Sequence, residues 1–309
     1  MQKMFLGNGK ILGIFYNARI PRMNNLPAQP LPAQPLPAQP LPTQPLTVAA
    51  AQAQPAPGDV AANAVTAARL AATARAQGAR LIVLPELFLS AYHPPALRAD
   101  PHGTAVTVDD PRLDPLRDTG IVVVVGAAVR HGDGRLTCSI LVVGQTVTVA
   151  YDKQHLWGPD ENELFTPGTA GTTLTVGGWR LGLGVCYDGC FPEHGRAAAL
   201  DGAHGYLAPS GYLDGSQHRR DLYYRARALD NTMYVVFANS VGGQAPWRFN
   251  GGAAIHDPQG RVLTQAPDDG EAIVMSTLDP VVLEQTRKAH TMLTDRLASL
   301  GATRTQITV

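Results

Sequence analysis

A buried strand that ends in a cysteine, with a helix opening a few residues later, constrains this chain most. Residues 179–185 are apolar and spaced by glycines, which predicts a strand buried on both faces. Cys186 follows directly, and Pro192 then opens an alanine-rich helical segment. In an open α/β sheet the chemistry lies outside the strand ends, and a helix N-terminus lowers the pKa of a nearby thiol. Cys186 is therefore the first candidate nucleophile, although a free cysteine here also suits simple apolar packing.

Two other predicted strands end in charged side chains. Residues 80–84 form a continuous apolar strand, and Glu86 follows at its tip. Residues 146–151 form the second arm of a hairpin, and Lys153 follows that arm. Taken singly, each residue has an ordinary alternative, a surface glutamate or a solvated turn lysine. Their matching positions at strand ends instead favour a site shared with Cys186.

The order of the predicted elements indicates an α/β fold. An early strand is followed by an alanine-rich helix capped by Asp59, and β-branched strands and hairpins occupy the middle of the chain. Residues 93–119 are expected to form a loop with at most one short helix, and residues 280–300 a terminal amphipathic helix. We expect a mixed pair of sheets covered by helices, within one domain that spans residues 46–300.

The two ends of the chain are expected to lie outside this domain. Residues 26–45 repeat the pentapeptide Leu-Pro-Ala-Gln-Pro four times, with Thr43 replacing alanine in the last copy. Two prolines in every five residues oppose both helix and sheet. We expect residues 1–45 to be a disordered tail without a catalytic role, a passive linker being favoured over a segment that docks on a partner. Residues 301–309 form a C-terminal tail.

The charge balance and the cysteine content indicate which partners and which cellular compartment to expect. Lysine plus arginine and aspartate plus glutamate each number 25, so nothing favours nucleic acid or a membrane surface. Three cysteines do not make a disulfide framework, which predicts a cytoplasmic protein. No apolar run approaches the roughly 20 residues that span a bilayer, and no convincing signal peptide precedes the domain. Small molecules are the expected partners.

If the three strand ends converge, a thiol, a carboxylate and an ammonium share one crevice. Glu86 then takes the proton of Cys186 as general base. Lys153 and the backbone N–H of Tyr187 hold the oxygen of the attacked carbonyl. This set predicts acyl transfer from an amide or nitrile through a thioester. His155 is an alternative base, although the sequence identifies no aspartate or asparagine that orients it.

The segments around these residues resemble the nitrilase superfamily of carbon–nitrogen hydrolases. Glu86 lies in Leu-Pro-Glu-Leu-Phe, Lys153 in Asp-Lys-Gln-His-Leu, and Cys186 in Cys-Tyr-Asp-Gly-Cys-Phe-Pro-Glu. Their order and spacing match the family, and the similarity covers residues 47–280. Further matching segments are Phe165-Thr166-Pro167-Gly168, Pro209-Ser210, residues 225–231, Ala238-Asn239 and residues 257–260.

The resemblance implies a fold and a fuller site. The fold is a four-layer αββα sandwich that assembles into homodimers or larger homo-oligomers, with no metal or organic cofactor. A second glutamate positions the substrate, six residues before the proline of the Phe-x-Pro-Gly element. Counting back from Pro167 gives Glu161, in preference to the nearby Glu163.

The segment at the nucleophile also bears on the substrate. Nitrilases of the family carry Cys-Trp-Glu, whereas Cys-Tyr-Asp is more similar to the amidase and carbamoylase branches. In carbamoyl-amino-acid hydrolases, arginines at the positions of Gly189 and Cys190 hold the substrate carboxylate. This chain has no cation there, which favours a neutral or differently anchored amide. Carbamoyl amide hydrolysis and nitrile hydrolysis remain the alternatives.

Two unrelated functions compete with hydrolysis. Cys186, Cys190 and His194 have a spacing compatible with a structural zinc site, to which Asp188 or Glu193 would add a ligand. Such sites usually need a second ligand pair, which the sequence lacks. A non-catalytic interaction protein is the other alternative, and the intact Glu, Lys and Cys set disfavours it.

Overall fold

Two six-stranded sheets form the centre of the molecule. In this computed structural model, residues 40–297 and 305–309 are described. The first sheet has the order β14 (Ala272–Leu278), β1 (Leu46–Gln52), β2 (Leu81–Val83), β3 (Val122–Arg130), β4 (Leu136–Val143) and β5 (Val147–Asp152). The second has the order β13 (Val262–Gln265), β12 (Ala254–His256), β9 (Tyr234–Asn239), β8 (Gly205–Ser210), β7 (Trp179–Leu183) and β6 (Thr173–Val176).

The two sheets face each other, so their central strands are buried on both sides. In β1, Val48 and Ala50 belong to the core between the sheets. Ala49 and Ala51 belong to a second core on the opposite face. This alternation follows from the two-residue period of a strand, and it explains why β1 reads as a continuous apolar run.

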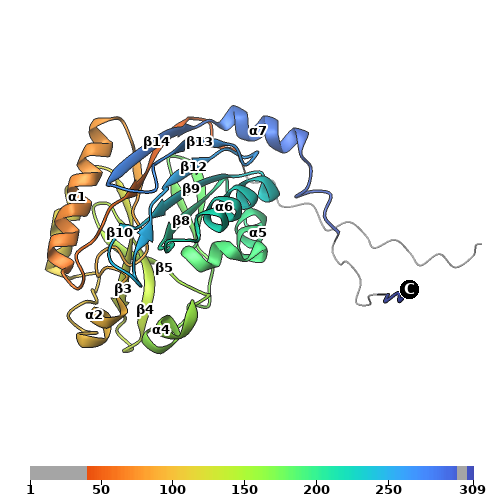
Figure 1. Ribbon diagram of the computed structural model, residues 1–309. Coiled ribbons are helices and arrows are strands. Elements are labelled where there is room, and N and C mark those ends of the chain that lie inside the picture. Colours follow the sequence, from red (N-terminus) through yellow and green to blue (C-terminus); the bar gives the residue numbers. More distant parts are fainter. Residues whose placement is uncertain (1–39, 298–304) are drawn as a thin grey trace, which may run out of the picture.

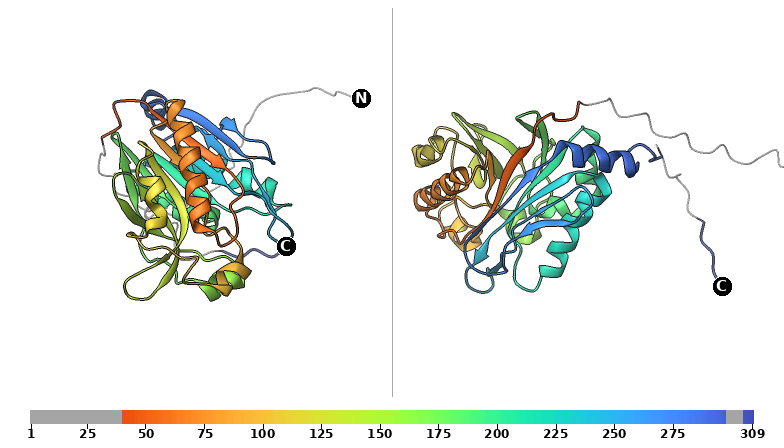
Figure 2. Two further views of the ribbon diagram at one scale, coloured as in Figure 1. Left: turned by 90° about the vertical axis from the view of Figure 1, so that its left-hand side faces the viewer. Right: turned by 90° about the horizontal axis from the view of Figure 1, so that it is seen from above.

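Helices cover the outer face of each sheet, as Figure 1 shows with α1 on one flank and α5 and α6 on the other. The first sheet is covered by α1 (Val60–Ala76), with η1 (Pro111–Leu113) and α3 (Asp114–Arg117) beside it. The second is covered by α5 (Pro192–Leu200) and α6 (Gln217–Asn231). The layers therefore run helix, sheet, sheet, helix, also visible from above in Figure 2. The expected αββα sandwich is confirmed.

Parallel strands bring the ends of distant segments together. β1, β2 and β3 are parallel neighbours in the first sheet, as are β7, β8 and β9 in the second. β1 contacts β9 across the core. The turn after β2 meets the end of β8, where the backbone N–H of Glu86 donates to the carbonyl of Ser210 at 3.3 Å. This edge holds the segments that follow β2, β5 and β7.

Several element boundaries differ from the sequence-based expectations. The terminal helix α7 (Pro280–Ala289) stops well before residue 300. Beyond it Leu293 is buried whereas Met292 and Leu297 are exposed, so the apolar positions do not share one face. The short helix α2 (Pro94–Ala99) lies in the segment expected as loop, and α4 (Gly158–Leu164) is a further short helix. The strands β10 (Val241–Gly242) and β11 (Phe249–Asn250) form a separate small pair.

Residues 26–39 of the proline-rich repeat lie outside the described residues, and residues 40–45 lie inside them. The expected disordered tail over residues 1–45 therefore falls outside the described part except for residues 40–45, and the expected tail over 301–309 is described only from residue 305. Within the described ranges, none of the helices has the length and apolar character needed to cross a bilayer.

Candidate active site

A buried lysine joins two glutamates at the edge where the strands end. Lys153 follows β5, and its Nζ donates to Glu86 Oε1 at 2.6 Å. The same Nζ contacts both carboxylate oxygens of Glu161, at 2.8 and 2.6 Å. All three side chains are almost completely removed from solvent. Buried charges persist only when they are paired, so these residues hold one another in a single arrangement.

Cys186 lies at the end of β7 in a strained conformation. Its φ is +45°, in the left-handed region that costs a non-glycine residue about 1–3 kcal/mol. The turn that follows is a 3₁₀ helix, η2 (Cys186–Cys190). Tyr224 donates a hydrogen bond to the Cys186 carbonyl at 2.9 Å, and Asp188 accepts one from the Val185 N–H at 3.0 Å. The surrounding contacts thus hold the cysteine at the strand end.

Cys186 lines a cavity of about 260 Å³ together with Glu161, Tyr92 and Tyr187. The sequence-predicted residues therefore surround one place, although they are distant along the chain. Glu86 and Lys153 lie behind the cavity wall, fully buried.

Burial shapes the proton equilibria of this cluster. Removal from water raises the pKa of Glu86 to about 7, against the opposing charge of Lys153. Burial would lower the pKa of Lys153, but the charges of Glu86 and Glu161 outweigh it and the pKa is raised well above its usual value. Burial and the Glu86 charge also raise the pKa of Cys186 well above that of an ordinary thiol. The cysteine is therefore a neutral thiol at rest.

The raised thiol pKa corrects a sequence-based expectation. We expected the adjoining helix to lower the pKa of Cys186, but burial and the adjacent carboxylate dominate. Because the thiol is neutral, it needs a base in order to attack. Glu86 Oε1 is occupied by Lys153, while Oε2 accepts no hydrogen bond from the described part of the chain. The Cys186 thiol is still near enough to lower the pKa of Glu86 by a small amount.

The structure separates the two glutamates that the sequence left close together. Glu161 lies in α4 and faces inward, where it also accepts a hydrogen bond from Tyr92 at 2.7 Å. Glu163 lies on the exposed side of the same helix and pairs with Arg98 at 2.7 Å. The helical turn explains the difference, because residues two positions apart in a helix face different directions.

His155 does not lie where a base for Cys186 would be needed. Its Nδ1 is 2.8 Å from Asp188 Oδ1, and its ring stacks on Phe191 with centroids 4.0 Å apart. It lines a different cavity, behind the nucleophile turn, with His194. The geometry therefore does not support the alternative of His155 as base. Asp188, the partner that the sequence did not reveal, holds His155 in a hydrogen-bond network behind the turn.

The residues considered as zinc ligands make other contacts in the structure. His194 lies between the hydroxyls of Tyr151 and Tyr206, each 2.9 Å away, and Cys190 contacts Tyr212. Over residues 40–297 and 305–309, no cluster of three or more His, Cys, Asp or Glu side chains suits a metal ion.

Two contacts at the site were missed by sequence reasoning. Tyr92, which binds Glu161, follows Glu86 by six residues, just before the segment expected as loop. Cys138 donates its thiol to Glu86 Oε1 at 3.7 Å. The only available signal was that Cys138 lies on the first arm of the hairpin, β4, which pairs with the strand β5 that leads into Lys153.

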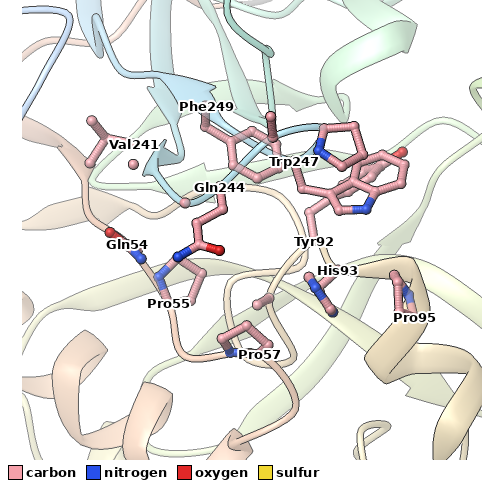
Figure 3. A pocket seen from close by; sticks show the side chains of 15 residues that line it. Gln54, Pro55, Pro57, Tyr92, His93, Pro95, Val241, Gln244, Trp247 and Phe249 are labelled. Carbon is pink, nitrogen blue, oxygen red and sulfur yellow. The ribbon is translucent and has the colours of Figure 1, made fainter.

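A second cavity of about 430 Å³ shares Tyr92 with the first (Figure 3). Its wall includes the rings of Tyr92, Trp247 and Phe249, with centroids 6.0 and 5.9 Å from that of Tyr92. The remaining surface is formed mainly by prolines and amides, including Pro55, Pro57, Pro95, Pro246, Gln54 and Gln244. The described lining of this second cavity thus contains no buried acidic or basic side chain.

Comparisons with known proteins are consistent with this geometry. The carbon–nitrogen hydrolase family profile matches residues 47–288. An (R)-stereoselective amidase from a Pseudomonas species is 36% identical over 233 residues, which cover 73% of this chain and 82% of the amidase. A Pseudomonas protegens protein described as a hydrolase in the pqqF 5' region is 33% identical over 260 residues, covering 81% of this chain and 88% of that protein.

A similar fold has been solved for an amidase of the nitrilase superfamily from Nesterenkonia AN1. The structure of its serine-for-cysteine mutant is 29% identical, with a TM-score of 0.69, and the match covers 79% of this chain and 95% of that chain. In another structure, an active-site cysteine of the Nesterenkonia amidase carries acrylamide attached by Michael addition.

Proposed function

This chain belongs to the carbon–nitrogen hydrolase family of the nitrilase superfamily, and from that premise we propose that it hydrolyses a small amide through a thioester on Cys186. One observation carries the proposal. The Cys186 thiol, whose pKa is raised, lies at one site with a glutamate whose pKa is raised to about 7 and which a buried lysine pairs with a second glutamate. The family establishes the class of enzyme, and this arrangement supports the cysteine mechanism.

The first step forms the acyl-enzyme. Glu86 in its carboxylate form takes the thiol proton as the sulfur of Cys186 attacks the amide carbon. The carbonyl π bond opens and leaves an anionic oxygen on a tetrahedral carbon. That oxygen is held by the Lys153 ammonium and the backbone N–H of Tyr187.

The second half of the cycle regenerates the thiol. Glu86 passes its proton to the amide nitrogen, the C–N bond breaks, and ammonia or an amine leaves. Water then attacks the thioester carbon while Glu86 takes a proton, and the C–S bond breaks to give the carboxylic acid. The Cys186 sulfur recovers its proton from Glu86, so each group returns to its starting state.

Lys153 and Glu161 keep this geometry fixed. Glu161 accepts from Lys153, Tyr92 and the backbone N–H of Trp157, so its carboxylate is fully engaged. We assign it the positioning of Lys153 and of the substrate amide rather than proton transfer. A rigid second carboxylate leaves Glu86 as the group that exchanges protons.

The nucleophile turn favours an amide over an N-carbamoyl amino acid. A Cβ at Gly189 would lie 2.7 Å from a ring carbon of Tyr224, so no side chain fits there without displacing a buried ring. The arginine found at this position in carbamoyl-amino-acid hydrolases therefore has no room in this chain. Far faster turnover of N-carbamoyl amino acids than of simple amides would overturn this choice.

We also propose that the enzyme forms a homo-oligomer and works in the cytoplasm. The outward side of α6 exposes Leu222 and Leu229, with 69% and 43% of their surface accessible, which suits contact with another copy. The three cysteines are free thiols, which suits a reducing compartment. Sedimentation of the full chain tests the first point, and cell fractionation tests the second.

Ammonia release from a panel of amides tests the proposed reaction, with Cys186→Ala as control. Intact-mass measurement during turnover should detect the added acyl group, and peptide mapping should locate it at Cys186. An acyl group on another residue, or turnover that survives in Cys186→Ala, would overturn the mechanism.

A further inference from the structure

The mouth of the catalytic cavity carries one basic side chain among its described lining residues. Cys186, which is partly buried, and Glu161, which is buried, mark the inner end of the cavity. Exposed Asp214 and Arg219 mark the outer end. A substrate whose amide reaches the sulfur must therefore extend its other end past Arg219. What this residue binds bears directly on which amides the enzyme accepts.

The charge of Arg219 is unmatched in the part of the chain that the structure describes. Both acids that line the cavity are already paired, Asp214 with Arg248 at 3.0 Å and Glu161 with Lys153. Arg219 makes no salt bridge within residues 40–297 or 305–309, whereas most other arginines of the domain pair or bind carbonyls. The guanidinium is thus free to bind a ligand.

Its position in the helix gives Arg219 no structural benefit. It lies in the first turn of α6, which begins at Gln217. The positive end of the helix dipole makes a cation unfavourable there. The field of Arg219 does reach the cavity wall. Burial raises the pKa of Cys190, and Arg219 is among the cations that oppose this rise.

We propose that Arg219 binds an anionic group at the end of the substrate remote from the scissile amide. Resting on the proposed function, this inference names the substrate class as small amides that carry a carboxylate. A guanidinium suits this task because its planar donors match a carboxylate in two parallel hydrogen bonds. Arg219 lies on α6 and not in the nucleophile turn. It would therefore supply, from another element, the positive charge that is absent at Gly189. The cavity of about 260 Å³ has room for a chain of several carbons between amide and acid.

The test compares straight-chain dicarboxylic acid monoamides with their methyl esters, which keep the length but remove the charge. We expect wild-type enzyme to prefer the acids. Arg219→Gln should lower the acid-to-ester ratio of kcat/KM by about 10–100-fold, mainly through KM, since a charged hydrogen bond contributes about 1.5–3 kcal/mol. Arg219→Glu should shift the preference toward an ω-amino amide of the same length.

Arg225→Gln is the matched control, because Arg225 is exposed on the same helix and binds the Gly260 carbonyl away from the cavity. It removes the same charge and should leave the ratio within about twofold. An unchanged ratio in Arg219→Gln, or an equal fall in Arg225→Gln, would overturn the proposal.

Binding separates this inference from the proposed reaction. Calorimetry on Cys186→Ala should show that a monoamide acid binds, and that adding Arg219→Gln weakens it by a similar factor. If the amide of the methyl ester is hydrolysed in a Cys186-dependent way but Arg219→Gln changes neither readout, the carboxylate-binding role of Arg219 is overturned and the proposed amidase activity stands. If the acid binds through Arg219 but no amide is hydrolysed, the proposed amidase activity is overturned and the anion-binding role of Arg219 stands.

Discussion

The two cavities that meet at Tyr92 differ in chemistry more than in form. The smaller, about 260 Å³, has a thiol and a carboxylate in its wall and a buried ion cluster behind it. The larger, about 430 Å³, is lined by aromatic rings, prolines and amides. Its His93 already caps α2 by accepting from the Ala96 N–H. The cavity that we propose as reactive is therefore distinguished by buried, mutually paired charges and not by its size.

Removal of the nucleophile should give the largest difference between the cavities. Cys186→Ala is expected to lower kcat by at least about 10⁴-fold, because no other group of the site can form the thioester. Ammonia release under saturating amide measures the loss, and circular dichroism checks that the fold is kept. Loss of the neighbouring thiol in Cys190→Ala should reduce activity far less. Comparable losses would move the chemistry away from Cys186.

Removal of the lysine should affect both stability and rate. Lys153→Ala leaves the buried Glu86 and Glu161 without their shared cation, which is expected to cost about 3–5 kcal/mol of unfolding free energy. We expect activity to fall by about 10³-fold, since an oxyanion donor is lost as well. Urea unfolding and steady-state kinetics measure the two effects.

The exposed Lys288 provides the control for this substitution. It pairs with Glu284 at 2.6 Å on the surface, so Lys288→Ala should cost less than about 1 kcal/mol. Equal destabilisation by the two variants would mean that the buried cluster is not specially stabilising.

Acid should inactivate the charged cavity through Glu86. Burial raises its pKa to about 7, and only the carboxylate accepts the thiol proton. As pH falls through 7, kcat/KM should therefore drop by about tenfold per unit, reaching about 100-fold at pH 5. A pH profile from 5 to 9 measures this limb. A limb centred near 4.5, or a flat profile, would exclude a raised pKa at the catalytic base.

The smallest expected effect concerns Tyr92, which lines both cavities, and it distinguishes the two cavities most directly. Tyr92→Phe removes the 2.7 Å hydrogen bond to Glu161 and keeps the ring, so we expect about a tenfold loss of kcat/KM. Trp247→Ala enlarges only the neutral cavity and should change the same parameter by less than about threefold. Parallel kinetics on one amide measure both, and a larger effect of Trp247→Ala would place substrate in the second cavity.

The outcome of the sequence-based expectations depended on how local the deciding contact is. The preference for Glu161 over Glu163 agrees with the direction of α4, which places Glu161 inside and Glu163 on the surface. His155 had no visible partner because Asp188 lies far away along the chain. The terminal helix was extended too far, since apolar residues after Ala289 suggested a periodicity that packing does not use.

The sequence by itself determined the main alternation of strands and helices and the three side chains that follow buried strands. Strand and helix periods are local, and Glu86, Lys153 and Cys186 follow directly from where buried runs stop. Only the tertiary structure decided what those residues meet and how they titrate. The ion cluster, the raised pKa values of Glu86 and Cys186, and the unmatched charge of Arg219 depend on burial and on neighbours from distant segments, because electrostatic energy is set by distance and dielectric surroundings rather than by position in the chain.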